Sequence, residues 1–164
     1  MNELVRDFKQ FRLEGDQATK MHAEYELVRR DIDLTKCPRV PDGSGIYFWL
    51  MTLDSVEYKV YIGRTKSLSR RVKEYANEFQ PHSPNDYKLR FFQEFMKDAA
   101  PGATLDLYSS KEMPKGLDNE ETVAVNEYDP LINVLPKPTS QAKNALMHAY
   151  SIYYRSLFEQ SLRS

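Results

Sequence analysis

Two short runs of apolar and aromatic residues, separated by a polar break, constrain the fold of this chain most. Residues 46–50 read Ile-Tyr-Phe-Trp-Leu, and residues 58–62 read Tyr-Lys-Val-Tyr-Ile. Both runs are rich in the aromatic and β-branched residues that strands favour, and the break at residues 54–55 predicts a β-hairpin between them. If the hairpin is centred on Asp54, Tyr47 lies opposite Tyr61.

Side chains alternate between the two faces of a strand, so this pairing divides the hairpin into two sides. The more apolar side would hold Ile46, Phe48, Leu50, Tyr58, Val60 and Ile62. The other side would bring the hydroxyls of Tyr47 and Tyr61 next to each other. Two phenols on the less apolar side suggest a functional site more than a core.

A basic helix is expected directly after the hairpin. Ser67 is a good N-cap residue, and an apolar stripe follows at helical spacing. The stripe consists of Leu68, Val72, Tyr75 and Phe79. Arg71 lies at its edge, where an isolated arginine packs its stem and leaves its charged end in water. Here Gly63 connects the strand to the helix close to Tyr61, so Arg71 can face the same pocket as the tyrosines.

At these residues the sequence resembles the GIY-YIG nuclease superfamily, which is named after the triplets Gly45-Ile46-Tyr47 and Tyr61-Ile62-Gly63. The string from Tyr61 onward matches the second strand and first helix of the family, and the catalytic arginine falls on Arg71. Further along, Glu121 and Asn133 match the glutamate-to-asparagine spacing of repair nucleases in the superfamily. The resemblance covers about residues 44–135, and the spacer between the triplets is slightly longer than usual.

The expected fold class is α+β. Helices are predicted over residues 86–99 and from Leu117, with a strand over residues 104–108. The resemblance implies a GIY-YIG core, residues 44–135, with a short antiparallel or mixed three-stranded sheet flanked by helices. An N-terminal helical arm, residues 1–43, and a C-terminal amphipathic helix, residues 139–164, would complete one compact domain.

The two terminal segments are expected to be helical. Apolar residues recur at helical spacing over residues 1–34, with a break at Gly15-Asp16, and again from Leu146 to Leu157. The charges of the N-terminal arm nearly balance, which favours packing on protein over contact with phosphates. We expect these helices to pack on each other within one chain or to form a homodimer or higher homo-oligomer.

Composition excludes several classes of protein. The chain has 164 residues, 41% of them apolar and 29% charged, as expected for a globular protein. No segment reaches the length of a membrane span, so no membrane partner is expected. The single cysteine, Cys37, excludes an internal disulfide and a cysteine-cluster zinc site, and it fits a reducing cytoplasm.

The net charge of −1 does not indicate a nucleic-acid-binding protein, but the distribution of charge does. Between Lys59 and Arg90 there are eight cations and three anions, and clustered positive charge is what phosphate contacts require. The alternative is a solvated helix face. The candidate DNA-binding residues are Arg64, Lys66, Arg70, Lys73 and Tyr75, the last of which could instead only fill the core.

The candidate catalytic residues are Tyr47, Tyr61, Arg71, Glu121 and Asn133. Cleavage of a phosphodiester needs an activated water, stabilisation of the phosphate charge and a protonated leaving oxygen. Arg71 can clamp a phosphate oxygen, and Glu121 can hold the Mg²⁺ or Mn²⁺ ion that the family uses, because Mg²⁺ keeps most of its hydration shell. The resemblance implies that Tyr47 is the general base and Tyr61 its supporting partner.

Two of these residues have ordinary structural explanations as well. Leu117, Glu121 and Val125 share one helix face, which turns the Glu121 carboxylate inward, but Asp118-x-x-Glu121 could also be a capping box. Asn133 could tie a loop to backbone groups, which is close to the role that the family gives it.

The sequence thus favours a Mg-dependent DNA endonuclease of the kind found in phages, mobile elements or restriction systems. The alternative is a catalytically inactive nucleic-acid-binding or scaffold protein with the same fold. The presence of all five candidate catalytic residues favours the enzyme.

Overall fold

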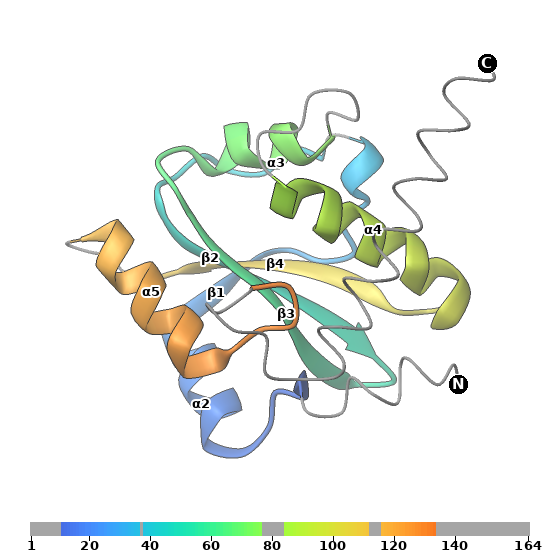
Figure 1. Cartoon of the computed structure of the whole chain (residues 1–164), viewed down its shortest axis with the longest axis horizontal. Coiled ribbons are helices and arrows are strands. Elements are labelled where there is room, and N and C mark those ends of the chain that lie inside the picture. The colour runs from blue at the N-terminus through green and yellow to red at the C-terminus, as the bar shows by residue number, and fades with distance from the viewer. Residues whose placement is uncertain (1–10, 37, 77–83, 112–115, 134–164) are drawn as a thin grey trace.

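A four-stranded antiparallel sheet forms the centre of the molecule, in the strand order β1-β4-β2-β3 (Figure 1). The computed structural model describes residues 11–36, 38–76, 84–111 and 116–133. The strands are β1 (Tyr25–Arg29), β2 (Gly45–Leu53), β3 (Val56–Thr65) and β4 (Thr104–Ser110). The α+β class is confirmed, but the prediction of three strands is wrong, because β1 joins the sheet as a fourth.

Helices cover both faces of the sheet (Figure 1). The helices α3 (Leu68–Ala76) and α4 (Pro84–Ala99) and the 3₁₀ turn η2 (Leu34–Lys36) bury side chains in one hydrophobic cluster. The helices α2 (Gly15–Glu24) and α5 (Leu117–Tyr128) bury theirs in a second cluster on the opposite face. The central strand β2 is therefore enclosed on both sides, and eight of its nine residues are buried.

The predicted hairpin is confirmed. Strands β2 and β3 pair antiparallel and are joined by a two-residue turn, Asp54-Ser55, whose φ angles of 51° and 64° are both positive. Positive φ at both central residues is the geometry of the turn whose twist matches that of the flanking strands.

The predicted register is wrong by two positions at Tyr47. The hairpin is centred between Asp54 and Ser55 and not on Asp54, which shifts the pairing by one residue, and a β-bulge shifts it by one more. Tyr58 and Lys59 pair with Met51 and Leu50, but the next pair along joins Tyr61 to Trp49, so Val60 has no partner residue. The extra residue shifts all later pairs. Together the two shifts place Tyr47 opposite Gly63 and not opposite Tyr61.

The bulge also redistributes the side chains between the two faces. Tyr58 and Val60 join Tyr47 and Tyr61 in the first cluster, whereas Ile46, Phe48, Leu50 and Ile62 form part of the second. The prediction for Tyr58 and Val60 is therefore wrong. So is the expectation of a less apolar side, because both faces of the hairpin lie in the hydrophobic core.

The described part of the N-terminal region, from residue 11 onward, is only partly helical. A helix spans Gly15–Glu24, but Tyr25–Arg29 form a strand that pairs with β4. The helical spacing of Met21, Tyr25 and Val28 is misleading, because Tyr-Glu-Leu-Val-Arg also suits a strand. Here Tyr25 packs in the second cluster and Val28 against the first, on opposite faces of the sheet.

The other predicted elements agree with the structure: α4 and β4 begin and end within two residues of the expected positions, and α3 and α5 begin at Leu68 and Leu117, where they were expected. One detail differs, because α5 begins at Leu117 after the N-cap Gly116, which places Asp118 inside the first turn. Asp118 is therefore not the N-cap of a capping box. The predictions for residues 1–10, for Phe79 and for the C-terminal helix, residues 139–164, lie outside the described residues.

The outer edge of β3 is covered by segments from distant parts of the sequence. The Leu13 N–H donates to the Glu57 carbonyl (2.8 Å), and the N–H groups of Leu131 and Ile132 donate to Lys59 (3.1 Å) and Val60 (2.8 Å). These bonds satisfy backbone groups that an edge strand would otherwise leave open to other chains.

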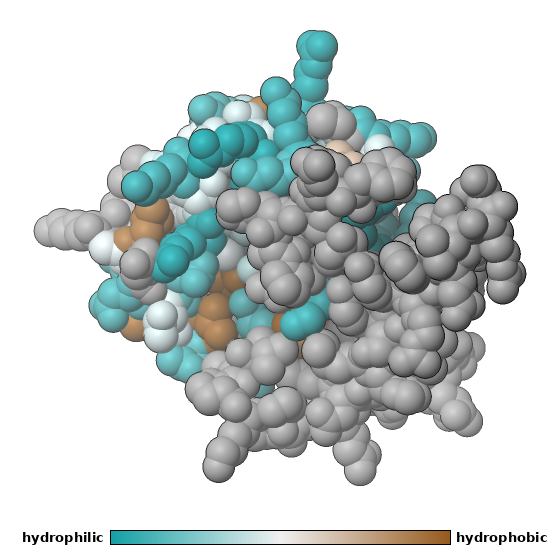
Figure 2. Space-filling view, turned by 45° about the horizontal axis from the view of Figure 1, so that its top comes forward, coloured by the Kyte–Doolittle hydropathy of each residue, from teal (hydrophilic) through white to brown (hydrophobic). Residues whose placement is uncertain are grey.

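The described surface is largely polar. On the face seen in Figure 2, hydrophilic side chains dominate the coloured area, and hydrophobic residues reach it in small patches. None of the helices in the described ranges has the length and apolar content needed to span a lipid bilayer.

Candidate functional site

The ring of Tyr47 lies directly over the backbone of Gly63 on the neighbouring strand. A Cβ atom added to Gly63 would overlap the phenol ring, so only glycine fits beneath it. The ring extends along β3 toward α3, and its hydroxyl reaches Arg71 and Tyr75. The two triplets are thus joined by direct packing.

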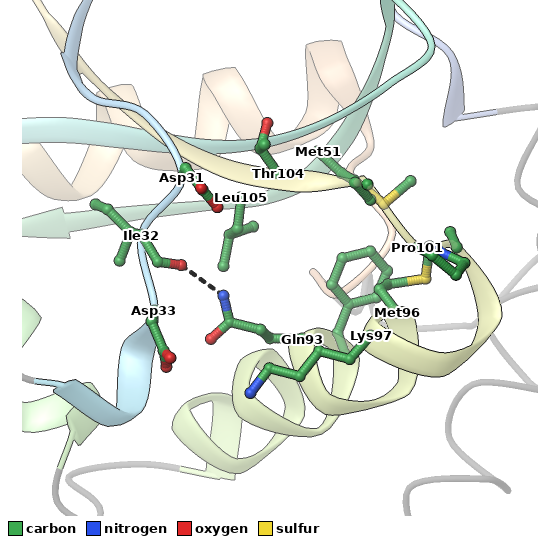
Figure 3. Close-up of a pocket in the computed structure, with 14 residues that line it drawn as sticks. Asp31, Ile32, Asp33, Met51, Gln93, Met96, Lys97, Pro101, Thr104 and Leu105 are labelled. Carbon is green, nitrogen blue, oxygen red and sulfur yellow. Dashed lines mark hydrogen bonds between the residues drawn. The ribbon is translucent and has the colours of Figure 1, made fainter.

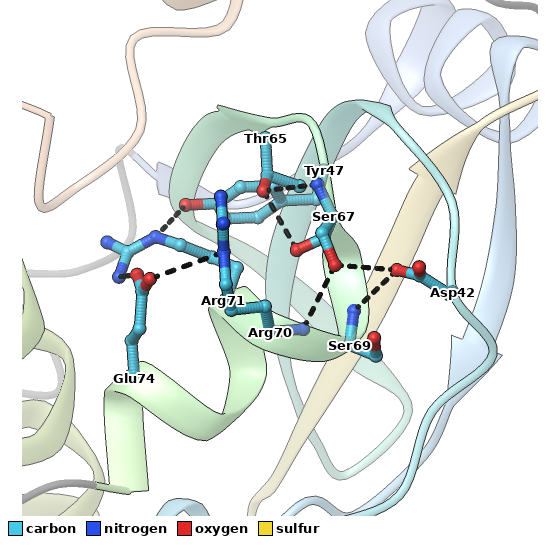
Figure 4. A network of polar contacts seen from close by, with 8 residues as sticks. All are labelled: Asp42, Tyr47, Thr65, Ser67, Ser69, Arg70, Arg71 and Glu74. Atoms are coloured by element: carbon cyan, nitrogen blue, oxygen red, sulfur yellow. Dashed lines mark hydrogen bonds and ion pairs between the residues drawn. The ribbon is translucent and has the colours of Figure 1, made fainter.

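Arg71 lies on α3, and its side chain is buried against the hairpin. Its Nε donates a hydrogen bond to the Tyr47 hydroxyl at 3.2 Å (Figure 4). Its guanidinium carbon lies 4.3 Å from the centre of the Tyr75 ring. Its side chain is only 10% exposed. The sequence alternative, an arginine with its charged end in water, does not describe this residue, because the aromatic face and the phenol enclose the guanidinium.

A carboxylate that the sequence analysis missed completes this contact. Glu74 Oε2 accepts a hydrogen bond from Arg71 Nη1 at 3.0 Å, and Glu74 Oε1 lies 3.7 Å from Arg70 Nε. The residues lie three and four positions apart on one helix, which is the spacing at which helical side chains meet. That spacing is the signal that could have identified Glu74.

Tyr75 belongs to the core. It is fully buried, its hydroxyl lies 3.0 Å from that of Tyr47, and its ring packs edge-on against Trp49. Burial raises the pKa of Tyr75 well above its ordinary value, and the nearby tyrosines Tyr47 and Tyr61 act in the same direction. Of the two alternatives for this residue, the structure has the one in which Tyr75 fills the core.

Tyr61 is close to Tyr47 although the two residues are not paired across the strands. Their ring centres are 6.2 Å apart and the rings are tilted by 54°. Both side chains lie in the first cluster, because the bulge at Val60 places Tyr61 on the same face as Tyr47. The proximity that the sequence predicted is therefore present, but it arises from a different register.

Asn133 ties the segment after α5 to the second triplet. Its Oδ1 accepts from the Ile62 N–H and its Nδ2 donates to the Ile62 carbonyl, both at 2.8 Å. The predicted structural role of Asn133 is confirmed. Through this pair of bonds it fixes the strand that carries Tyr61 and Gly63.

Glu121 lies on α5, and its side chain is half-buried. The buried residues of that helix, Ala124 and Tyr128, belong to the second cluster, on the face of the sheet opposite Tyr47 and Arg71. Among the described residues, no three histidine, cysteine, aspartate or glutamate side chains lie together as a metal-binding group. A hydrated Mg²⁺ ion needs as few as one or two protein carboxylates, so a single glutamate suits that ion better than a zinc-type site.

The four predicted phosphate-binding cations, Arg64, Lys66, Arg70 and Lys73, all have exposed side chains. Arg64 is the second-last residue of β3, Lys66 follows the strand, and the other two lie on α3. All four therefore lie on the helix that carries Arg71 or in the segment that leads into it.

The start of α3 is fixed by Asp42, which the sequence analysis did not single out. Its Oδ1 accepts from the Ser67 hydroxyl (2.8 Å) and the Ser69 N–H (3.3 Å), and these bonds lower the pKa of Asp42 to about 2 (Figure 4). Ser67 Oγ in turn accepts from the Arg70 N–H (3.4 Å). The predicted N-cap role of Ser67 is thus supported, and Asp42 holds it in place.

A separate cavity of about 340 Å³ lies between α4 and the segment after β1 (Figure 3). Met51, Met96 and Phe92 line its interior, and Gln93 spans it by donating to the Ile32 carbonyl and accepting from the Leu34 N–H. None of the predicted site residues lines this cavity.

Comparisons with known proteins give no further guide. No family model, no curated protein and no solved structure matches this chain. The assignment of a function therefore depends on the geometry of the site itself.

Proposed function

We propose that this protein is a metal-dependent DNA endonuclease of the GIY-YIG type. The observation that carries the proposal is the hydrogen bond from Arg71 Nε to the Tyr47 hydroxyl, inside a cluster that also holds Tyr61 and Tyr75. A guanidinium fixed against a phenol can bind a phosphate oxygen while the phenol addresses the attacking water.

Each residue has one task in this proposal. Tyr47 orients or deprotonates the water, Tyr61 supports it, and Arg71 stabilises the charge on the phosphate. Asn133 holds the strand of the second triplet, through Ile62. Glu121 would hold a Mg²⁺ or Mn²⁺ ion, which would supply further charge stabilisation on the phosphate and a bound water to protonate the leaving oxygen. The buried residues of α5 lie on the face of the sheet opposite Tyr47 and Arg71, so this assignment depends on the effect of Glu121→Ala on cleavage.

One observation favours the rival function, an inactive nucleic-acid-binding or scaffold protein. Tyr47 is 2% exposed, so a phosphodiester reaches its hydroxyl only if the surrounding side chains move. In that case the cluster would serve only to stabilise the fold.

Incubation of a supercoiled plasmid with Mg²⁺, with Mn²⁺ and with a chelator distinguishes the two functions. The endonuclease nicks or linearises the plasmid only with a metal ion. Tyr47→Phe and Glu121→Ala should each lower the rate at least a hundredfold, whereas Glu120→Ala, at an exposed position on the same helix, should not. Intact plasmid at every metal concentration, despite DNA binding, would establish the inactive alternative.

A further inference from the structure

One edge of the Arg71 guanidinium is already bound to an anion. Glu74 Oε2 lies 3.0 Å from Nη1, while Nε is bound to Tyr47 and the flat face of the group rests on Tyr75. Carboxylate and phosphate oxygens bind the same N–H donors of a guanidinium, so they compete for this edge.

We propose that Glu74 occupies the phosphate-binding edge of Arg71 in the free protein, and that a phosphodiester binds there by displacing it. The inference rests on the proposed function for its substrate, but the anion site can be tested without cleavage. Glu74 is then a regulatory residue of the site, one that sets the affinity for substrate.

The two partners of this ion pair differ in their freedom to move. The Arg71 side chain is 10% exposed and enclosed by Tyr47 and Tyr75, whereas that of Glu74 is 26% exposed. Glu74 therefore has the freedom to leave the contact, and Arg71 remains in place.

A second arginine is available to receive the displaced carboxylate. Arg70 Nε already lies 3.7 Å from Glu74 Oε1, and the Arg70 side chain is 69% exposed. A rotation of the carboxylate toward Arg70 keeps the negative charge paired in solvent, where an ion pair needs no desolvation. The structure thus offers Glu74 two positions, one against each arginine.

The alternative is that Glu74 only positions Arg71. The two roles predict opposite changes in the affinity for anions when the charge of Glu74 is removed. Removal of the charge with retention of shape, Glu74→Gln, should strengthen anion binding if Glu74 competes with phosphate, and should weaken it if Glu74 positions the guanidinium.

The experiment measures binding by isothermal titration calorimetry. The full chain is titrated with inorganic phosphate and, separately, with a short DNA duplex in the absence of metal. The only tryptophan, Trp49, packs against Tyr75 with ring centres 5.8 Å apart, so its fluorescence reports on binding at this cluster. Glu94→Gln is the matched control, because Glu94 pairs with Lys97 at the same 3.0 Å across three positions of α4. Glu94→Gln changes the net charge by the same amount as Glu74→Gln.

We expect Glu74→Gln to bind both phosphate and duplex about fivefold more tightly than the unchanged protein, with a change in Trp49 fluorescence. The gain should persist in an Arg70→Gln background. Glu94→Gln should change neither affinity beyond the small effect of net charge.

Weaker or equal binding by Glu74→Gln, or a gain that disappears with Arg70→Gln, overturns the inference. A phosphate affinity that rises in a protein unable to cut plasmid supports the anion site and rejects only the nuclease. Conversely, plasmid cleavage without any effect of Glu74→Gln on phosphate binding rejects only the role of Glu74.

Discussion

At the scale of single residues, the contact between Gly63 and Tyr47 explains why the second triplet ends in glycine. The Tyr47 ring occupies the space that a Cβ atom at residue 63 would need, and this close approach brings the hydroxyl to Arg71. The glycine is thus required by packing.

We predict that Gly63→Ala destabilises the protein by about 1–3 kcal/mol, because the new methyl group forces the Tyr47 ring or the strand to shift. Urea unfolding measures the change. Gly43→Ala is the control, since nothing lies within 4 Å of a Cβ atom placed there, and it should leave the midpoint nearly unchanged. Equal stability of the two variants would mean that the ring does not rest on Gly63.

At the scale of elements, the β2–β3 turn stores strain that can be relieved. Ser55 has a φ of 64°, a conformation that costs most residues roughly 1–2 kcal/mol and costs glycine little. Ser55→Gly should therefore raise the free energy of unfolding by about 0.5–1 kcal/mol, after the greater flexibility of glycine in the unfolded chain is subtracted.

The matched control for this turn is Ala23→Gly, at an exposed position inside α2. Inside a helix, glycine is expected to lower the free energy of unfolding by up to about 1 kcal/mol. Loss of stability in Ser55→Gly would indicate that the Ser55 side chain supports the turn.

Local patterns predicted most elements because each depends on short-range periodicity. The hairpin, α3, α4 and α5 all follow from spacing within ten or so residues. The β1 strand did not, since Tyr25–Arg29 fits both periods and only its pairing with β4, eighty residues away in sequence, decides between them. Non-local pairing of this kind is invisible to a local pattern.

The candidate site was predictable in its members but not in its arrangement. Tyr47, Arg71 and Asn133 were identified from the sequence, and all three have defined partners in the structure. The bulge at Val60 was not foreseen, because nothing in an apolar run marks the residue that will lack a partner. That one residue decides which side chains share a face with Tyr61.

At the scale of the whole molecule, buried tyrosines make stability depend on alkaline pH. Burial raises the pKa values of Tyr25, Tyr75 and Tyr128 in the folded state above the ordinary value near 10. The folded protein therefore holds these protons more tightly than the unfolded chain. Their contribution is complete below pH 10 and is lost above it, by up to about 1.4 kcal/mol per pH unit for each group.

Tyr128→Phe tests this dependence. The Tyr128 hydroxyl is buried and has no hydrogen-bond partner among the described residues. Its removal should leave stability at pH 7 unchanged or raise it by about 1 kcal/mol, and should flatten the decline above pH 10. Tyr75→Phe loses the bond to Tyr47 and should instead lower stability at pH 7 by about 1 kcal/mol. The measurement is the free energy of unfolding from pH 7 to 11. If both variants lose stability above pH 10 as steeply as the unchanged protein, the buried tyrosines are not the cause of the decline.

Under the proposed function, the exposed cations around α3 allow DNA binding to be tested separately from cleavage. Neutralisation of one exposed cation, for example Lys73→Gln, should weaken DNA binding and lower its salt dependence by roughly one unit. Lys20→Gln is the control, because Lys20 lies on α2, across the sheet. An unchanged salt dependence in variants of Arg64, Lys66, Arg70 and Lys73 would locate the DNA elsewhere.

The covered edge of β3 has a consequence for synthesis of the chain on the ribosome. Asn133 binds Ile62 across 71 positions of sequence, so the hairpin emerges long before the segment that closes it. At about 5–20 residues per second, the strand edge stays open for roughly 4–14 seconds. During that interval the bulge at Val60 interrupts the regular ladder on which a neighbouring nascent chain could add a strand. We therefore expect the irregularity that brings Tyr61 beside Tyr47 to make the unfinished chain less prone to aggregation as well.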